Sequence, residues 1–159
     1  MDPKKELLLT REFDAPRELV WKAWTDPKLV AQWWGPNGVT IPVCEFDAKV
    51  GGDLHIVMLA GEALGPMKGQ RWPMHGTITE MVAPEKLVFT STALEDPDGT
   101  PNMENIVTVL FEERNGKTIV TVHVLVTHAT EKAGPALAGM SMGWNQQLDK
   151  LVSLYHTFT

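Results

Sequence analysis

The hydrophobic period of this chain changes along its length, and this change constrains the fold more than any other feature. Between residues 43 and 127, apolar and polar side chains alternate in one short segment after another. A period of two is typical of β-strands that bury one face. We expect six strands in this block, at 43–48, 53–59, 74–82, 86–94, 103–112 and 118–127.

Residues that favour turns separate these segments. Gly51-Gly52, Pro84-Glu85 and Asn115-Gly116 each lie between two of them, and Asp-Pro-Asp-Gly occupies 96–99. Asn-Gly between alternating segments is a strong short-range signal of a hairpin. Successive strands joined by such short turns predict an antiparallel meander.

The alternation also predicts that one face of the sheet is more apolar than the other. Leu54, Ile56 and Met58 share one face of their strand, whereas Asp53 and His55 lie on the opposite face. The later strands repeat this pattern with Ile78, Val107, Val109, Phe111, Val120, Val122, Val124 and Val126. We therefore expect one face of the sheet to be buried.

Two short helices are expected before this block. A first strand at 6–13 is followed by Pro16, which suits the first turn of a helix over 16–24. Asp26 is a suitable N-cap for a second helix. That helix ends at Trp33-Trp34, because Gly35-Pro36 is a typical stop signal.

After residue 130 the apolar positions recur at steps of three and four, which predicts one long helix over 132–157. Its apolar face is formed by Leu137, Met140, Trp144, Leu148, Leu151, Tyr155 and Phe158. Gly134-Pro135, Gly139 and Gly143 weaken its first half, so we expect a kink or a late start there. The helix must bury its apolar face, and the apolar face of the sheet is the available partner.

Together these patterns predict an α+β fold: a curved antiparallel sheet of about seven strands around a long C-terminal helix, with two short helices after the first strand. An apolar cavity is expected between sheet and helix. A length of 159 residues fits one domain over 1–159.

Net charge, cysteine count and apolar runs limit the partners and the location that we expect. The formal net charge is −6 and the basic residues are scattered, so we expect no nucleic-acid partner. The single cysteine, Cys44, cannot form an internal disulfide and fits a reducing compartment. No apolar run approaches the ~18 residues of a membrane span. We expect a cytoplasmic protein without a membrane span.

Several short sequences, in order along nearly the whole chain, carry a resemblance to a known family. They are FDAP at 13–16, VWKAWTDP at 20–27, QWWGP at 32–36, VGGD at 50–53, HGTITE at 75–80, PEKLVFT at 84–90 and GW at 143–144. With them the chain resembles the START-like (SRPBCC, helix-grip) superfamily and, more narrowly, is similar to the activator of heat-shock-protein-90 ATPase homologues, C-terminal-domain type. The resemblance implies the helix-grip fold and a cavity. It implies no single activity, because the superfamily includes lipid carriers, hormone receptors, polyketide cyclases and aromatases.

Catalytic and metal-binding motifs are not found in the sequence. The histidines lack metal-site spacing, and His55, His75 and His123 have the parity of the outer face, while His128 is expected in a loop. No Gly-x-Ser-x-Gly elbow or phosphate-binding glycine loop is present. Cys44, beside an anion, is expected to be an ordinary apolar residue. We therefore expect no metal, no cofactor and a binding protein rather than an enzyme.

The candidate ligand-binding residues are those expected to face the cavity. They are Trp33, Trp34, Leu54, Ile56, Met58, Arg71, Ile78, Asn105, Val107, Val109, Met140 and Trp144. Of the successive Trp33 and Trp34, one is expected in the core while the other reaches the cavity mouth or solvent. Arg71-Trp72 fits either a polar pair at the mouth or an ordinary loop, and we favour the loop.

Methionine side chains accommodate varied ligands and equally serve as core filler. The methionines expected near the cavity are Met58, Met67, Met74, Met103, Met140 and Met142. Three functions follow. The first is binding of a small hydrophobic or aromatic molecule. The second, suggested only by the family, is a chaperone-associated interaction domain. The third, a cyclase or aromatase, would need an acid–base pair that the sequence does not offer.

Overall fold

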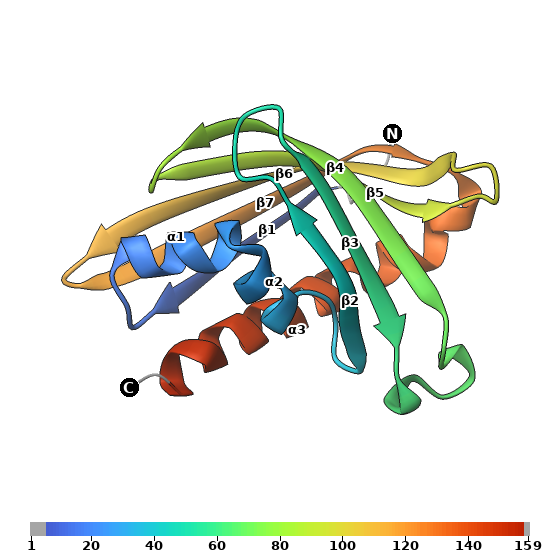
Figure 1. Ribbon diagram of the computed structural model, residues 1–159, viewed down its shortest axis with the longest axis horizontal. Helices are drawn as coiled ribbons and strands as arrows, with labels where there is room; N and C mark the ends of the chain where they lie inside the picture. The colour runs from blue at the N-terminus through green and yellow to red at the C-terminus, as the bar shows by residue number, and fades with distance from the viewer. Residues whose placement is uncertain (1–5, 158–159) are drawn as a thin grey trace.

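The computed structural model describes residues 6–157 and shows a curled antiparallel sheet with a long helix lying across its open side (Figure 1). The predicted α+β helix-grip architecture is confirmed. The strands are β1 Glu6–Phe13, β2 Val39–Phe46, β3 Asp53–Ala60, β4 Arg71–Val82, β5 Lys86–Glu95, β6 Pro101–Arg114 and β7 Lys117–Ala129. Every predicted strand is present, and most are longer than predicted.

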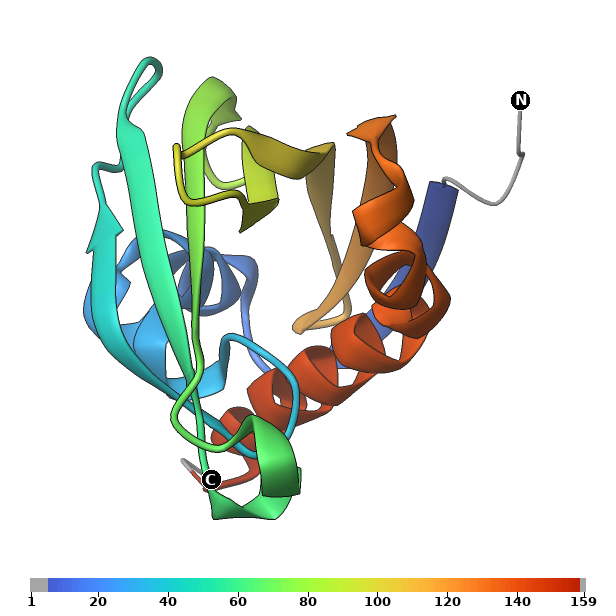
Figure 2. The same cartoon turned by 90° about the vertical axis from the view of Figure 1, so that its right-hand side faces the viewer.

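The strand order is β1-β7-β6-β5-β4-β3-β2, and all neighbours are antiparallel. The six later strands form the predicted meander. The first strand pairs with the last, so the two ends of the chain's strand region meet at one edge of the sheet. Figure 2 shows the sheet curling from β2–β4 on one side, past the β5–β6 hairpin, to β7 and β1 on the other.

The sheet curls most visibly where β4 changes partners. The first half of β4 pairs with β3, and its second half, from Ile78, pairs with β5. Between the halves, the hydroxyls of Thr90 and Thr92 replace ladder carbonyls. They accept hydrogen bonds from the backbone N–H of Thr77 at 3.0 Å and of His75 at 3.1 Å. These side-chain hydrogen bonds keep residues 75–77 of β4 beside β5 where the regular pairing stops.

The helices are α1 Arg17–Thr25, α2 Pro27–Trp33 and α3 Gly134–Thr157, with short 3-10 helices at Glu62–Met67 (η1) and Glu131–Ala133 (η2). Asp26 caps α2 as predicted, since its carboxylate accepts from the N–H of Lys28 at 3.0 Å. The last helix starts at Gly134 rather than at residue 132, and η2 leads directly into it. The helix then continues through Gly139 and Gly143, and Phe158 lies outside the described residues. Within residues 6–157, none of the helices is long and apolar enough to cross a membrane.

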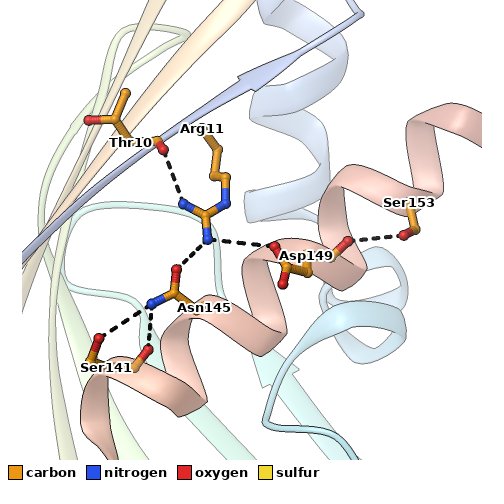
Figure 3. A network of polar contacts seen from close by, with 6 residues as sticks. All are labelled: Thr10, Arg11, Ser141, Asn145, Asp149 and Ser153. Carbon is orange, nitrogen blue, oxygen red and sulfur yellow. Dashed lines mark hydrogen bonds and ion pairs between the residues drawn. The ribbon is translucent and has the colours of Figure 1, made fainter.

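Polar contacts fix α3 against the rest of the protein. Figure 3 shows Arg11 of β1 reaching α3, where its guanidinium donates to Asn145 Oδ1 and lies 3.5 Å from Asp149 Oδ1. On the side of α2, the buried Gln147 accepts a hydrogen bond from the N–H of Gly35 at 2.9 Å. Lys150 Nζ donates to the carbonyl of Trp34 at 3.3 Å. These contacts hold α3 across the open side of the sheet.

Candidate functional site

The buried apolar side chains between sheet and helices form two clusters. The main cluster consists of Phe13, Ala15, Val20, Ala23, Trp24, Val30, Trp33, Trp34, Leu54, Ile56, Met74, Ile78, Leu87, Phe89, Val107, Val109, Phe111, Val120, Val122, Val124, Leu148 and Leu151. The minor cluster consists of Met103, Val126 and Ala133, near the start of α3. Met140 of α3 packs against both clusters although it is only half-buried. The region where the two clusters meet, beside Met140, is the candidate site.

A polar pair lies on the inner face of the sheet between these clusters. Ser91 of β5 is paired in register with Asn105 of β6. The neighbouring inward positions are Phe89 and Val107 on one side, in the main cluster, and Met103 on the other, in the minor cluster. Asn105 Nδ2 donates to Ser91 Oγ at 3.3 Å. Asn105 Oδ1 is buried and has no hydrogen-bond partner.

The helix side of the site is apolar and incompletely covered. Leu137, Met140 and Trp144 pack against the clusters, yet each remains partly exposed. The Trp144 ring meets Trp34 edge to face with centroids 5.8 Å apart. Ideal Cβ atoms on Gly139 and Gly143 would meet no atom within 4 Å. Gly139 is exposed and Gly143 partly exposed, so both glycines border open space.

The expectation that one of the two adjacent tryptophans reaches the mouth or solvent is wrong, because both are buried. Trp33 packs on Trp24 with centroids 4.6 Å apart, and its Nε1 donates to the Ala23 carbonyl at 2.9 Å. Trp34 has extended backbone at the end of α2, which turns its ring toward Trp144 and Phe89. A change of backbone conformation between the two residues places both rings inside.

The structure brings eleven of the twelve candidate ligand-binding residues together. Those in the main cluster are Trp33, Trp34, Leu54, Ile56, Ile78, Val107 and Val109. Met58, Met140 and Trp144 pack against that cluster, and Asn105 belongs to the polar pair beside it. Arg71 is exposed and does not belong to either cluster. Two methionines expected near the cavity, Met67 and Met142, are also exposed.

Arg71 and Trp72 begin β4, so the favoured loop interpretation is wrong. They line a depression of about 290 Å³ between the start of β4 and the β5–β6 hairpin. Sequence reasoning missed three polar residues on its far side, Asp96, Asn102 and Lys132. Their types are common in solvated loops, and nothing in the sequence indicates that they meet.

These three residues link the β5–β6 hairpin to the start of α3. Lys132 Nζ lies 2.7 Å from Asp96 Oδ1, and Asn102 Nδ2 donates to the same oxygen at 2.9 Å. The hydrogen bond from Lys132 holds the pKa of Asp96 below its usual value. Thr130 Oγ1 completes the link by donating to Asn102 Oδ1 at 2.6 Å. The hairpin is thereby tied to the segment that leads into α3.

A second depression, of about 620 Å³, is lined by residues of β2 to β5 that include Glu45, Thr90 and both His55 and His75. The two histidine rings stack with centroids 4.5 Å apart, and His55 Nδ1 lies 3.0 Å from Glu45 Oε1. His55, His75 and His123 occupy the outer face as predicted, but His128 lies in β7 rather than in a loop. Among residues 6–157, no group of three or more His, Cys, Asp and Glu side chains is placed to hold a metal ion.

Cys44 lies within β2 and packs against the main cluster. Burial raises the pKa of its thiol to about 11. The thiol is therefore protonated at neutral pH, which disfavours nucleophilic chemistry. The cause is desolvation rather than the neighbouring Glu45.

The family model described as Activator of Hsp90 ATPase homolog 1-like protein matches residues 14–156. The chain belongs to this family. Among solved structures, a Chromobacterium violaceum protein is 27% identical, with 95% of this chain and 96% of that chain covered and a TM-score of 0.79. The AHSA1 protein of Silicibacter pomeroyi is 26% identical, with 97% and 99% covered and a TM-score of 0.78. No curated protein matches this family member.

A more distant solved structure shares the fold alone. CalU16 from Micromonospora echinospora is 20% identical, with 94% of this chain and 74% of that chain covered and a TM-score of 0.63.

Proposed function

We propose that this family member binds a small hydrophobic or aromatic molecule between the inner face of its sheet and α3. The observation that carries the proposal is the state of Met140. Its side chain packs against both apolar clusters and still stays partly exposed. Protein interiors normally close-pack such side chains. A half-buried methionine between two clusters is suited to contact a ligand, because its thioether adapts to varied shapes.

The polar groups at the proposed site favour binding over acid–base catalysis. Ser91 and Asn105 do not titrate near neutral pH, whereas general acid–base catalysis needs a group whose pKa lies near the operating pH. Ligand sites are mostly apolar with a few placed polar groups, which matches this composition. We also propose a cytoplasmic location, with which a single free cysteine is compatible.

A panel of fatty acids, sterols, flavonoids and aromatic polyketides tests the proposal by thermal unfolding and calorimetry. A compound that binds only the folded protein at 100 times its Kd adds about 2.7 kcal/mol to the free energy of unfolding. For a chain of this length, that gain raises the melting temperature by roughly 5–10 °C. We expect at least one compound to produce a saturable rise of this size.

Two substitutions on α3 localise the response. Met140→Trp fills the proposed space and should abolish binding while leaving the fold intact. Met142→Trp introduces the same side chain at a position that is 66% exposed and should change nothing. Equal binding by both variants would place the ligand elsewhere. If no compound binds and an experimental structure shows the space packed solid, the proposal fails and a chaperone-associated interaction domain becomes the better hypothesis.

A further inference from the structure

We infer that Ser91 and Asn105 anchor the ligand and that the ligand offers them an uncharged hydroxyl group on an aromatic ring. The inference rests on the proposed function and names the class of molecule bound there. Its basis is the hydrogen-bonding capacity that this pair leaves unused inside the protein.

The acceptor is Asn105 Oδ1. It is buried and has no partner, whereas buried polar atoms in folded proteins nearly always have one. An unpaired buried acceptor costs its full desolvation energy. The neighbouring side chains on this face do not relieve the cost, because Val107 and Val126 flank Asn105 along and across the strands. A hydrogen-bond donor on a bound molecule would relieve this cost.

The donor is the hydroxyl of Ser91, a residue only 6% exposed. In its bond with Asn105 the Ser91 oxygen acts as acceptor of the Nδ2 hydrogen. Its own hydrogen can therefore rotate toward a ligand oxygen. The pair thus presents one acceptor and one donor side by side. A hydroxyl group, which both donates and accepts, matches this arrangement.

The strand geometry beside Asn105 is a second, independent indication that a ligand binds at this pair. Glu104 pairs with His128 and Asn105 with Val126, so Thr127 of β7 is an extra residue between two ladder pairs. Such β-bulges re-aim side chains and are over-represented next to active sites. Here the bulge lies directly beside the unpaired carboxamide oxygen.

The surroundings of the pair select an uncharged and aromatic molecule. Its inward neighbours Phe89, Val107 and Met103 are apolar. A carboxylate would be buried there without a counter-charge, which is strongly unfavourable. Met140 of α3 packs against both clusters and Trp144 against the main one, and sulfur and indole groups both make favourable contacts with aromatic rings. A phenol-type hydroxyl stays neutral at pH 7, as that of tyrosine does.

Three naphthalene probes of similar size test the inference: 2-naphthol, 2-methylnaphthalene and 2-naphthoate, titrated by calorimetry at pH 7. We expect 2-naphthol to bind about tenfold more tightly than 2-methylnaphthalene, and 2-naphthoate to bind most weakly. Asn105→Leu should remove the preference for the hydroxyl and leave 2-methylnaphthalene bound at least as tightly. Ser91→Ala, a smaller change, should reduce the preference and guards against misfolding of the first variant. Thr108→Val, on the opposite face of β6, should keep it.

The outcomes separate the anchor from the proposed function. Equal affinities for 2-naphthol and 2-methylnaphthalene would overturn the anchor while leaving an apolar binding site. Tightest binding of 2-naphthoate, or an undiminished hydroxyl preference in both Asn105→Leu and Ser91→Ala, would also overturn it. If none of the probes binds, the anchor is overturned together with the site on which it rests.

Discussion

Gly76 lies where β4 leaves β5, and the missing side chain lets the two backbones come close. A Cβ atom at this position would lie 1.9 Å from the carbonyl oxygen of Thr90, so the backbones would have to shift. We expect Gly76→Ala to lower the free energy of unfolding by about 1–3 kcal/mol, as overpacking usually does. Urea denaturation measures the change.

Gly139→Ala is the matched control. Nothing lies within 4 Å of a Cβ at Gly139, which is exposed in the middle of α3. Alanine there should stabilise the protein by about 0.5–1 kcal/mol, because glycine is a poor helix former. The two substitutions should therefore have opposite signs. If Gly76→Ala leaves the free energy of unfolding unchanged, the close approach of the β4 and β5 backbones is contradicted.

Single residues also show where sequence reasoning succeeds and fails. The sequence analysis included Asn105 among the cavity residues, and strand parity with Val107 is consistent with its place on the inner face. The same argument applied to Phe89 would have found Ser91, a polar residue on an apolar face. Parity could not reveal that Asn105 Oδ1 lacks a partner, because that depends on the side chains of three adjacent strands.

Trp144 tests how α3 is held against the sheet. Its ring packs on the main cluster and contacts Trp34, but it is only partly buried. We expect Trp144→Ala to destabilise the protein by about 2–4 kcal/mol, somewhat less than full burial would give. Met142→Ala, two residues earlier and exposed, should change stability by less than about 0.5 kcal/mol. Similar effects of the two substitutions in chemical denaturation would contradict the packing of this helix.

Most secondary structure could be predicted from hydrophobic period and turn residues, and the misses have physical causes. Proline in a strand argues against a central position, so Arg71 and Trp72 before Pro73 were expected in a loop. The first half of β4 pairs with β3, whereas its regular pairing with β5 begins only at Ile78, so a proline at position 73 costs little on the β5 side. The short helix η1 has no hydrophobic period and could not be predicted.

At the scale of the whole molecule, the position of α3 depends on contacts between distant parts of the chain. Arg11 binds Asn145, and Gly35 binds Gln147. These contacts fix how closely α3 approaches the sheet. Hydrophobic period can predict that the helix faces the sheet, but it cannot predict how closely they approach. For this reason the fold could be predicted in detail and the ligand could not.

Methionine methyl groups provide the most direct measurement of the central claim, which is that a ligand binds between the sheet and α3. The chain has eight methionines. Met58, Met103 and Met140 lie at the proposed site, whereas Met67 and Met142 are exposed. NMR spectra of methyl-labelled methionine are recorded while a stabilising compound from the panel is added. We predict saturable shifts at Met58, Met103 and Met140, with Met67 and Met142 unchanged. Shifts confined to Met67 or Met142 would contradict binding between the sheet and α3.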